Sequence, residues 1–180
     1  MKTGLKLIVA ASMVAALFMT SKVQAQDKTE ATPSPWSFSI GPEFGLPTGV
    51  AKLGANFTIG ATGRFQYDVS KMFALTFTAG GYHFLPKTNP ATGDRYQSYG
   101  ELPIKAGVKI FPVSNFYIGA EAGAAFEKLE SGWGPHRLDL SPALGYAAGH
   151  WDFAVHYDYL HRSEDHFGEV GLRLAYAFGL

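Results

Sequence analysis

The chain has 180 residues, of which 47% are hydrophobic and 17% are charged. This length favours a single domain, and the composition is too apolar for a disordered chain. Cysteine is absent, which excludes disulfides, thiolate metal sites and a cysteine nucleophile. Basic and acidic residues number 15 each, so no net charge attracts the chain to nucleic acid.

The N-terminal 25 residues have the pattern of a secretory signal peptide. Lys2 and Lys6 precede an apolar run at 7–19, and Val23 and Ala25 supply the small residues of a cleavage site. The run is shorter than the roughly 20 residues that a transmembrane helix needs. We therefore expect export through a cleaved signal peptide, residues 1–25. Residues 26–35 are polar and contain proline, which predicts a flexible periplasmic leader before a domain at 36–180.

From residue 36 onward, apolar and polar side chains alternate with a period of two, in blocks of about ten residues separated by turn signals. Such blocks are typical of antiparallel strands. They predict eight strands, within 36–46, 56–68, 72–84, 101–110, 116–123, 138–146, 152–159 and 169–178.

The connections between these blocks alternate in length. Short turns are expected at 68–71, 111–115 and 148–150, and longer loops at 47–55, 85–98, 127–137 and 161–166. An even number of antiparallel strands with this alternation fits a membrane barrel. Because the bilayer has no water to satisfy an open sheet edge, the sheet must close. The sequence thus predicts an all-β fold, an eight-stranded antiparallel up-and-down transmembrane β-barrel.

Charged side chains are confined to the polar face of the alternation, and in a barrel this face lines the lumen. An eight-stranded lumen is just wide enough for side chains to fill. We therefore expect a plug rather than a pore lining, with no metal. The expected lumen charge network consists of Glu43, Arg64, Glu101, Lys105, Lys109, Glu121, Asp139, Asp152, His156, Asp158, Glu169 and Arg173.

Three finer expectations concern this network. Equal offsets from Val113 predict that Lys105 lies opposite Glu121, and Asp158 is expected to face Glu169 across the last hairpin. The inward acids outnumber the lysines and arginines, so we expect some acids at the exposed rim.

Aromatic residues gather toward both ends of the predicted strands, as interfacial girdles do in membrane barrels. The girdle near the chain termini would contain Trp36, Phe38, Phe65, Tyr67, Phe73, Phe111, Phe116, Tyr146, Trp151, Phe153, Tyr176 and Phe178. The other would contain Phe44, Phe57, Phe84, Tyr99, Phe126, Tyr157, Tyr159 and Phe167. These positions favour an outer face that contacts lipid.

Three segments, LPIKAGVK at 102–109, FYIGAEAG at 116–123 and GLRLAYAF at 171–178, carry a family resemblance. With them, the chain resembles the small eight-stranded outer-membrane barrels of the OmpA transmembrane-domain and OmpX type. The last segment resembles the C-terminal strand signal read by the barrel-assembly machinery, although the chain ends in Gly179-Leu180 rather than an aromatic residue. The resemblance implies a bacterial outer-membrane location, with membrane lipid and the assembly machinery as partners. We also expect a monomer without cofactor.

One pattern suggests catalysis. His161 and Ser163, with Glu169 farther on, resemble the His-x-Ser pair and glutamate of outer-membrane lipid A deacylases, and a serine activated by histidine is sound esterase chemistry. The match is short and no oxyanion hole is evident. We therefore expect no enzyme and keep these three residues as candidates for an alternative, a deacylase-like hydrolase.

The sequence favours a structural or adhesive role through exterior loops. Residues 85–98 and 127–137, the latter with Trp133, are the best candidates for contact with an extracellular ligand. Besides the hydrolase, two alternatives stay open: a narrow pore and a soluble ligand-binding barrel.

Overall fold

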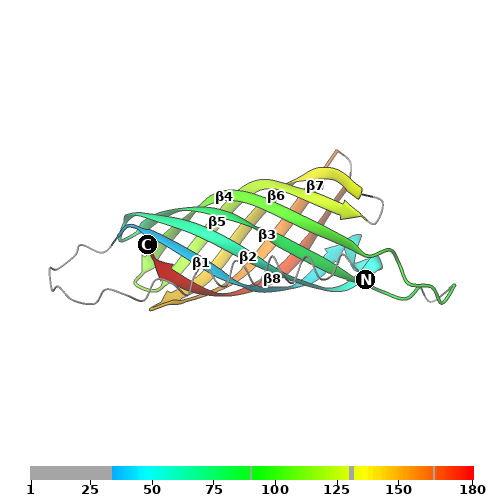
Figure 1. The fold of residues 1–180 in the computed structure, drawn as a ribbon, viewed down its shortest axis with the longest axis horizontal. Helices are drawn as coiled ribbons and strands as arrows, with labels where there is room; N and C mark the ends of the chain where they lie inside the picture. The colour runs from blue at the N-terminus through cyan, green and yellow to red at the C-terminus, as the bar shows by residue number, and fades with distance from the viewer. Residues whose placement is uncertain (1–33, 90, 130–131, 164) are drawn as a thin grey trace, which may run out of the picture. The chain divides into compact units, whose positions relative to one another are not determined.

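The computed structural model describes residues 34–89, 91–129, 132–163 and 165–180, which form a closed β-barrel (Figure 1). The expected signal peptide, 1–25, and residues 26–33 of the expected leader lie outside the described residues. The strands are β1 (Trp36–Gly49), β2 (Ala55–Ser70), β3 (Phe73–Pro86), β4 (Tyr99–Val113), β5 (Phe116–Leu129), β6 (Gly132–Ala148), β7 (Trp151–Arg162) and β8 (Asp165–Gly179). The predicted fold class is confirmed.

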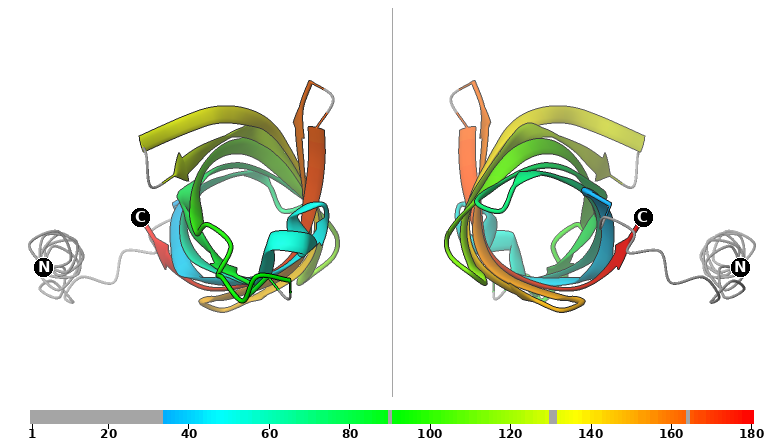
Figure 2. Two further views of the ribbon diagram at one scale, coloured as in Figure 1. Left: turned by 90° about the vertical axis from the view of Figure 1, so that its right-hand side faces the viewer. Right: turned by 90° about the vertical axis from the view of Figure 1, so that its left-hand side faces the viewer.

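Each strand pairs antiparallel with its neighbours in the chain, and β1 pairs with β8 to close the ring seen end-on in Figure 2. The connections β2–β3, β4–β5 and β6–β7 lie at one end of the barrel, with the start of β1 and the end of β8; we call this the turn end. The other four connections lie at the opposite end, the loop end.

The loop end differs from expectation because two predicted loops are largely strand. β5 and β6 continue into the segment 127–137, where Lys128 pairs with Trp133 and Leu129 with Gly132. β7 and β8 continue to the pair Arg162–Asp165. Glycine, proline and polar residues in these segments read as turns, but backbone hydrogen bonds can extend a ladder without an apolar face. The hairpins project beyond the ring in Figure 2.

The loop predicted at 47–55 contains a short helix, α2 (Ala51–Gly54), which the alternation does not predict. The amide of Leu53 donates to the carbonyl of Val50 at 3.0 Å, which forms a single tight turn at the mouth of the barrel. Among the described residues, no helix is long and apolar enough to cross a membrane.

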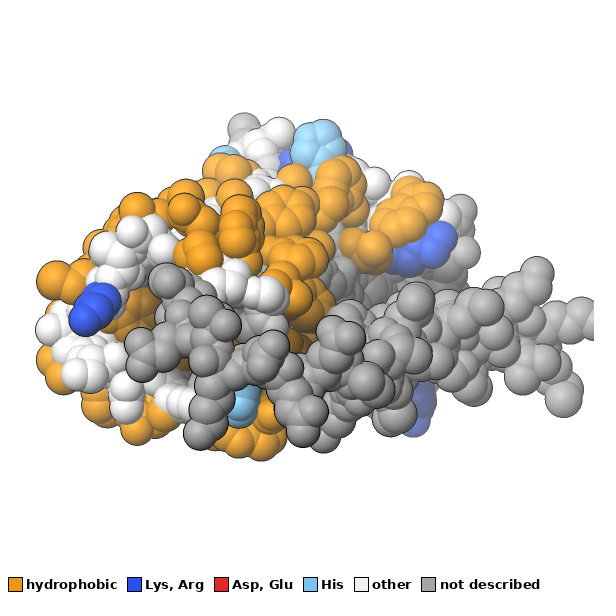
Figure 3. Space-filling model, turned by 60° about the vertical axis from the view of Figure 1, so that its left-hand side comes forward, with side chains coloured by type: hydrophobic (Ala, Val, Ile, Leu, Met, Phe, Trp, Pro, Cys, Tyr) orange, Lys and Arg blue, Asp and Glu red, His pale blue; other side chains and the backbone are white. Residues whose placement is uncertain are grey.

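The two faces of the wall differ as the alternation predicts. Ile118, Leu144 and Leu172 point outward and are 55%, 66% and 47% exposed, whereas Arg173, next to Leu172, is 0% exposed in the lumen. The face in Figure 3 is covered over much of its described area by hydrophobic side chains. The chain therefore buries charge and exposes apolar surface, the reverse of a water-soluble protein.

Aromatic side chains at the turn end pair across neighbouring strands. The ring centroids of Phe38 and Phe65 lie 4.8 Å apart, and those of Phe116 and Tyr146 lie 4.9 Å apart. Trp36 contacts Tyr67 at 4.7 Å in the same way. Phe111 contacts the buried Tyr117 of the lumen instead, with centroids 5.4 Å apart.

Glycine creates room for large inward side chains at specific places. A Cβ at Gly145 would overlap the Tyr117 ring, and one at Gly171 would overlap the His156 ring. Each added Cβ would lie less than 3.0 Å from ring atoms, a distance that real Cβ atoms essentially never show. Glycine at these positions thus leaves room for the rings of Tyr117 and His156 beside the paired strand.

Candidate functional site

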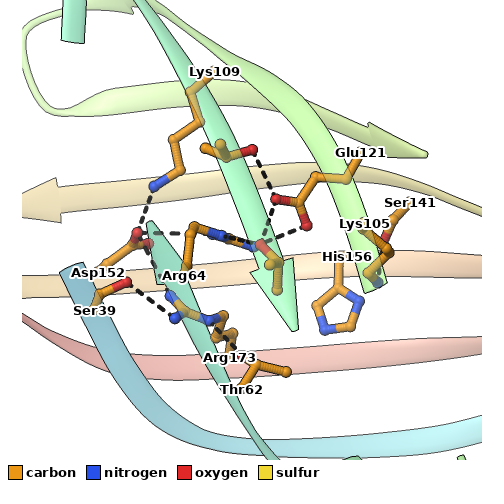
Figure 4. Close-up of polar contacts among 12 residues, drawn as sticks. Ser39, Thr62, Arg64, Lys105, Lys109, Glu121, Ser141, Asp152, His156 and Arg173 are labelled. Carbon is orange, nitrogen blue, oxygen red and sulfur yellow. Dashed lines mark hydrogen bonds and ion pairs between the residues drawn. The ribbon is translucent and has the colours of Figure 1, made fainter. Parts of the chain in front are cut away.

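The lumen near the turn end is organised around the carboxylate of Asp152 on β7 (Figure 4). Lys109 Nζ donates to Asp152 Oδ2 at 2.5 Å, and the Tyr117 hydroxyl donates to Oδ1 at 2.7 Å. Guanidinium nitrogens of Arg64 and Arg173 lie 3.9 and 3.7 Å from Oδ2. One carboxylate thus joins side chains from β2, β4, β5 and β8 across the barrel.

Arg64 forms a second connection across the lumen. Its Nη2 donates to Glu121 Oε2 at 3.1 Å, and its Nε donates to the Thr78 hydroxyl at 2.8 Å. The hydroxyls of Thr76 and Thr78 both donate to Glu121 Oε1 at 2.8 Å. Because β2 and β5 are not neighbours, this contact spans the interior rather than following the wall.

Glu43 and Arg173 connect the two strands that close the barrel. They are paired residues on β1 and β8, and Arg173 Nε lies 3.4 Å from Glu43 Oε1. Arg173 also donates to the hydroxyls of Ser39 and Thr62, at 3.1 and 3.0 Å. Thr62 in turn donates to Glu43, so the seam is hydrogen-bonded inside the lumen as well as along its backbone.

Lys105 neutralises carboxylates on the opposite wall. Its Nζ lies 3.0 Å from Asp158 Oδ1 and 3.3 Å from Asp139 Oδ2. The predicted pair of Lys105 with Glu121 is wrong, because Lys105 pairs with Gly123. The prediction assumed that residues equally far from Val113 pair with each other. A register shift between Ile110 and Val113 changes the pairing of the β4–β5 hairpin, so that assumption fails.

The inward acids do not reach the rim, contrary to expectation. Asp158 does face Glu169, and both are buried, at 2% and 3% exposed. His156 lies between acids, with Nδ1 3.1 Å from Asp158 Oδ1 and Nε2 3.0 Å from Glu43 Oε2. Glu101 Oε2 and Glu169 Oε2 have no hydrogen-bond partner among the described residues. The excess of acid is thus held inside the barrel, between the loop end and Lys105.

An apolar layer lies on the loop-end side of these acids. Phe84, Leu160 and Phe167 are buried there, with Ala55, Tyr82 and Ala125. The Phe84 ring stacks on Tyr99 with centroids 4.1 Å apart and meets Phe167 edge-on at 6.3 Å. Phe84, Tyr99 and Phe167 were expected in the outer girdle and are found packed inside the mouth. These three residues lie two positions from the inward-facing Tyr82, Glu101 and Glu169, and side chains two apart in a strand point to the same face. The alternation could therefore have placed all three inside the barrel.

The packing between these layers leaves little space. A cavity lined by Glu43, Arg64, Tyr82, Lys105 and other inward residues has a volume of about 10 Å³. This is at the lower limit for one water molecule. Charged side chains and the apolar layer thus fill the lumen together.

Above the apolar layer, the mouth holds a larger cavity of about 290 Å³, lined in part by Tyr99, Arg137 and Phe167. Arg137 was not among the expected site residues, because its segment reads as a loop. Extending the alternation backward from Asp139 would have identified it as inward. Arg137 Nε donates to Glu127 Oε1 at 2.5 Å, and Nη2 donates to Asp165 Oδ2 at 2.9 Å.

The candidate catalytic residues are not brought together. Ser163 lies exposed at the tip of the β7–β8 hairpin, beyond the pair Arg162–Asp165. Glu169 is in the lumen four positions farther along β8 than Asp165, which at about 3.4 Å per residue places it about 14 Å farther along the strand. His161 stacks on Tyr159 with ring centroids 6.1 Å apart. Among the described residues, no group of three or more His, Asp or Glu side chains is placed to hold a metal ion.

The closed antiparallel ring of eight strands, with polar side chains inside and apolar ones outside, is the fold of the small eight-stranded outer-membrane β-barrels. No family model matches the chain, and no curated protein matches it by sequence.

Solved structures show the likeness. The crystal structure of Ail, the attachment invasion locus protein of Yersinia pestis, is similar with a TM-score of 0.55 at 13% identity, covering 82% of this chain and 100% of Ail. The structure of Ail in a phospholipid bilayer nanodisc is similar with a TM-score of 0.57 at 14% identity, covering 79% of this chain and 98% of Ail. The crystal structure of the N-terminal β-barrel domain of Pseudomonas aeruginosa OprF is similar with a TM-score of 0.54 at 15% identity, covering 82% of this chain and 100% of that domain. At these identities the likeness establishes the fold.

Proposed function

We propose that this protein is an integral barrel of the bacterial outer membrane, exported through a cleaved signal peptide, whose filled lumen makes it an anchor rather than a channel. The loop end faces the cell exterior and serves a structural or adhesive role. Membrane lipid surrounds the wall, and the barrel-assembly machinery inserts the chain.

The distribution of polarity carries this proposal. Leu144 is 66% exposed on the wall, while Arg173 and Asp139 are 0% exposed in the lumen. In water this arrangement would expose apolar side chains and bury charge at once, and both are unfavourable. In a bilayer the same wall contacts hydrocarbon, and the closed sheet leaves no unpaired edge. The arrangement therefore argues against the soluble ligand-binding barrel.

The tight lumen supports an anchor over a narrow pore. Ions would have to pass both the apolar layer at Phe84 and Phe167 and the ion pairs around Lys105 and Asp152. The cavity between them holds no more than about one water molecule, which leaves no room for a water column at that level of the lumen.

Fractionation and heat-modifiability test the anchor. The full chain, expressed in a Gram-negative host, should appear in the outer-membrane fraction, and its unboiled band should migrate differently from its boiled band. In planar bilayers the folded protein should give no steady conductance. A soluble periplasmic protein without a gel shift would overturn the membrane assignment, and stable single-channel steps would overturn the closed lumen.

Exposed aromatic side chains at the loop end favour adhesion. Trp133 on the β5–β6 hairpin is 63% exposed, and Lys128 Nζ lies 5.0 Å from the centroid of its ring. Cells displaying Trp133→Ser should attach less to cultured epithelial monolayers than wild-type cells do. Met72→Ser, which changes an exposed apolar residue at the turn end, is the matched control. Equal attachment by cells lacking the protein would contradict the adhesive role and leave the anchor intact.

A further inference from the structure

The cavity at the loop-end mouth has features that the closed barrel does not require. It is built from five separate parts of the chain: the β1–α2 connection, the start of β4, the end of β5, the start of β6 and the start of β8. Its volume of about 290 Å³ is close to the lower end of small-ligand pockets. The left view of Figure 2 faces the loop end, where these segments lie.

Arg137 is held rigidly in this cavity yet is left with an unused donor. Its side chain is fixed by Glu127 and Asp165, and its Cζ lies 5.0 Å from the centroid of the Phe167 ring. The residue is 8% exposed, and its Nη1 has no hydrogen-bond partner among the described residues. A buried guanidinium nitrogen without an acceptor is rare, and none of the described residues supplies one, which makes Nη1 a candidate donor to a bound ligand.

The charges at the cavity narrow the chemistry of that oxygen. Glu127 and Asp165 place two carboxylates against one guanidinium, which leaves the local charge negative. A phosphate, sulfate or carboxylate would be repelled by this excess of negative charge. A hydroxyl, in contrast, can accept a hydrogen bond from Arg137 and donate one to a carboxylate. The side chain of Asp165 is 58% exposed, so a ligand can reach the pair from outside.

The floor of the cavity supplies an apolar surface for a ring. Tyr99 and Phe167 line it, and both pack on the buried Phe84, which fixes their orientation. Phe167 is 6% exposed beneath Arg137, so Tyr99 is the ring that a ligand can reach. A ligand with a C–H face and several hydroxyls on its edge would satisfy that ring, the free Nη1 and the carboxylates together. Gln97, also in the lining, adds an amide that donates and accepts.

From this geometry we infer that the mouth binds an uncharged sugar ring, such as one hexose unit of a glycan, with its hydroxyls on Arg137, Glu127 and Asp165 and its apolar face on Tyr99. The inference rests on the proposed function, because it identifies the ligand class of the loop end that we place outside the cell.

Binding is measured on the full folded protein in a detergent without a sugar headgroup, so that the micelle does not compete. The probes are the methyl glycosides of glucose, galactose, mannose, fucose and N-acetylglucosamine. Their binding is detected by saturation-transfer NMR and quantified by titrating each glycoside into the protein. Glucose 6-phosphate is the anionic comparison. At least one neutral glycoside should bind saturably, and the phosphate should bind more weakly than methyl glucoside.

Variants locate the site. Arg137→Met should weaken binding about tenfold or more, since a charge-assisted hydrogen bond is lost. Gln97→Ala and Phe167→Leu should each weaken it less, and Arg95→Gln, an exposed arginine at the same end but outside the lining, should leave it unchanged. The heat shift on gels is read for every variant. If Arg137→Met does not fold, Gln97→Ala and Phe167→Leu decide the location.

Folded wild-type protein that binds none of the neutral glycosides would overturn the inference and leave Arg137 a structural clamp. Tighter binding of glucose 6-phosphate, or glycoside binding unchanged in the folded variants, would overturn it too. In each case an intact heat shift shows that the membrane barrel stands, whereas a missing heat shift in the wild type would contradict the proposed function itself.

Discussion

Glu43 and Arg173 lie directly opposite each other on β1 and β8, the two strands that close the barrel, and their charged groups approach to 3.4 Å in the lumen. They come from the first and the last strand of the barrel, so this contact exists only once the ring is complete. Arg173 is 0% exposed and also contacts Ser39, Thr62 and Asp152. The seam that closes the sheet is therefore also joined by a buried ion pair.

Removing one member of this pair should destabilise the barrel strongly. Arg173→Met leaves the carboxylates of Glu43 and Asp152 short of a buried positive charge, and we expect the free energy of unfolding to fall by about 3–5 kcal/mol. Urea titration of the refolded protein in detergent measures the change. Glu43→Gln in the same chain should recover part of the loss, because the two residues are coupled. Arg95→Gln in the exposed β3–β4 loop serves as control, and a loss of similar size there would refute the argument.

The lipid contact of the wall is tested by placing a charge on it. Leu172 lies midway along β8 and is 47% exposed, so Leu172→Arg should cost about 2–4 kcal/mol when the barrel folds in a bilayer. Leu53 in α2 is 72% exposed at the loop end, and Leu53→Arg should change stability little. Folding into lipid vesicles, measured by denaturant titration, compares the two. Equal stability of both variants would indicate that Leu172 faces water.

Close packing of Tyr117 against the wall predicts a steric effect at Gly145. A methyl group there would meet the tyrosine ring, and Gly145→Ala should lower the free energy of unfolding by about 1–3 kcal/mol. Gly54→Ala is the matched change, because nothing lies within 4 Å of its added Cβ. Combining Gly145→Ala with Tyr117→Leu should cost less than the sum of the two single changes. Strict additivity would mean that the ring does not cause the penalty.

Ser163 has a backbone φ of 50°, in the left-handed region that favours glycine. Ser163→Gly should therefore stabilise the β7–β8 hairpin, by up to about 1 kcal/mol, whereas Ser163→Ala should keep the strain. The hydrolase alternative makes a different prediction, namely that both changes abolish release of fatty acid from lipid A. Ester hydrolysis by the wild type that is lost in both variants would establish a catalytic serine; we expect no release from any of the three proteins.

The alternation of side chains along the chain by itself determines much of this fold. Blocks such as 36–46 and 116–123 place apolar residues on one face and polar residues on the other. This pattern is local, since successive side chains of a strand point to opposite faces. It is sufficient for the number of strands, the antiparallel order and the assignment of charged residues such as Arg64 and Asp152 to the lumen.

Only the closed barrel decides which of those residues meet. Lys105 bridges to Asp139 and Asp158 rather than to Glu121, because a register shift in one hairpin and the tilt of the strands set the partners across the lumen. Phe84 and Phe167 close the lumen from inside the mouth. Their position near the strand ends had predicted that they contact the lipid interface. Periodicity is a property of one strand, whereas partners across a barrel depend on the stagger and closure of all the strands together.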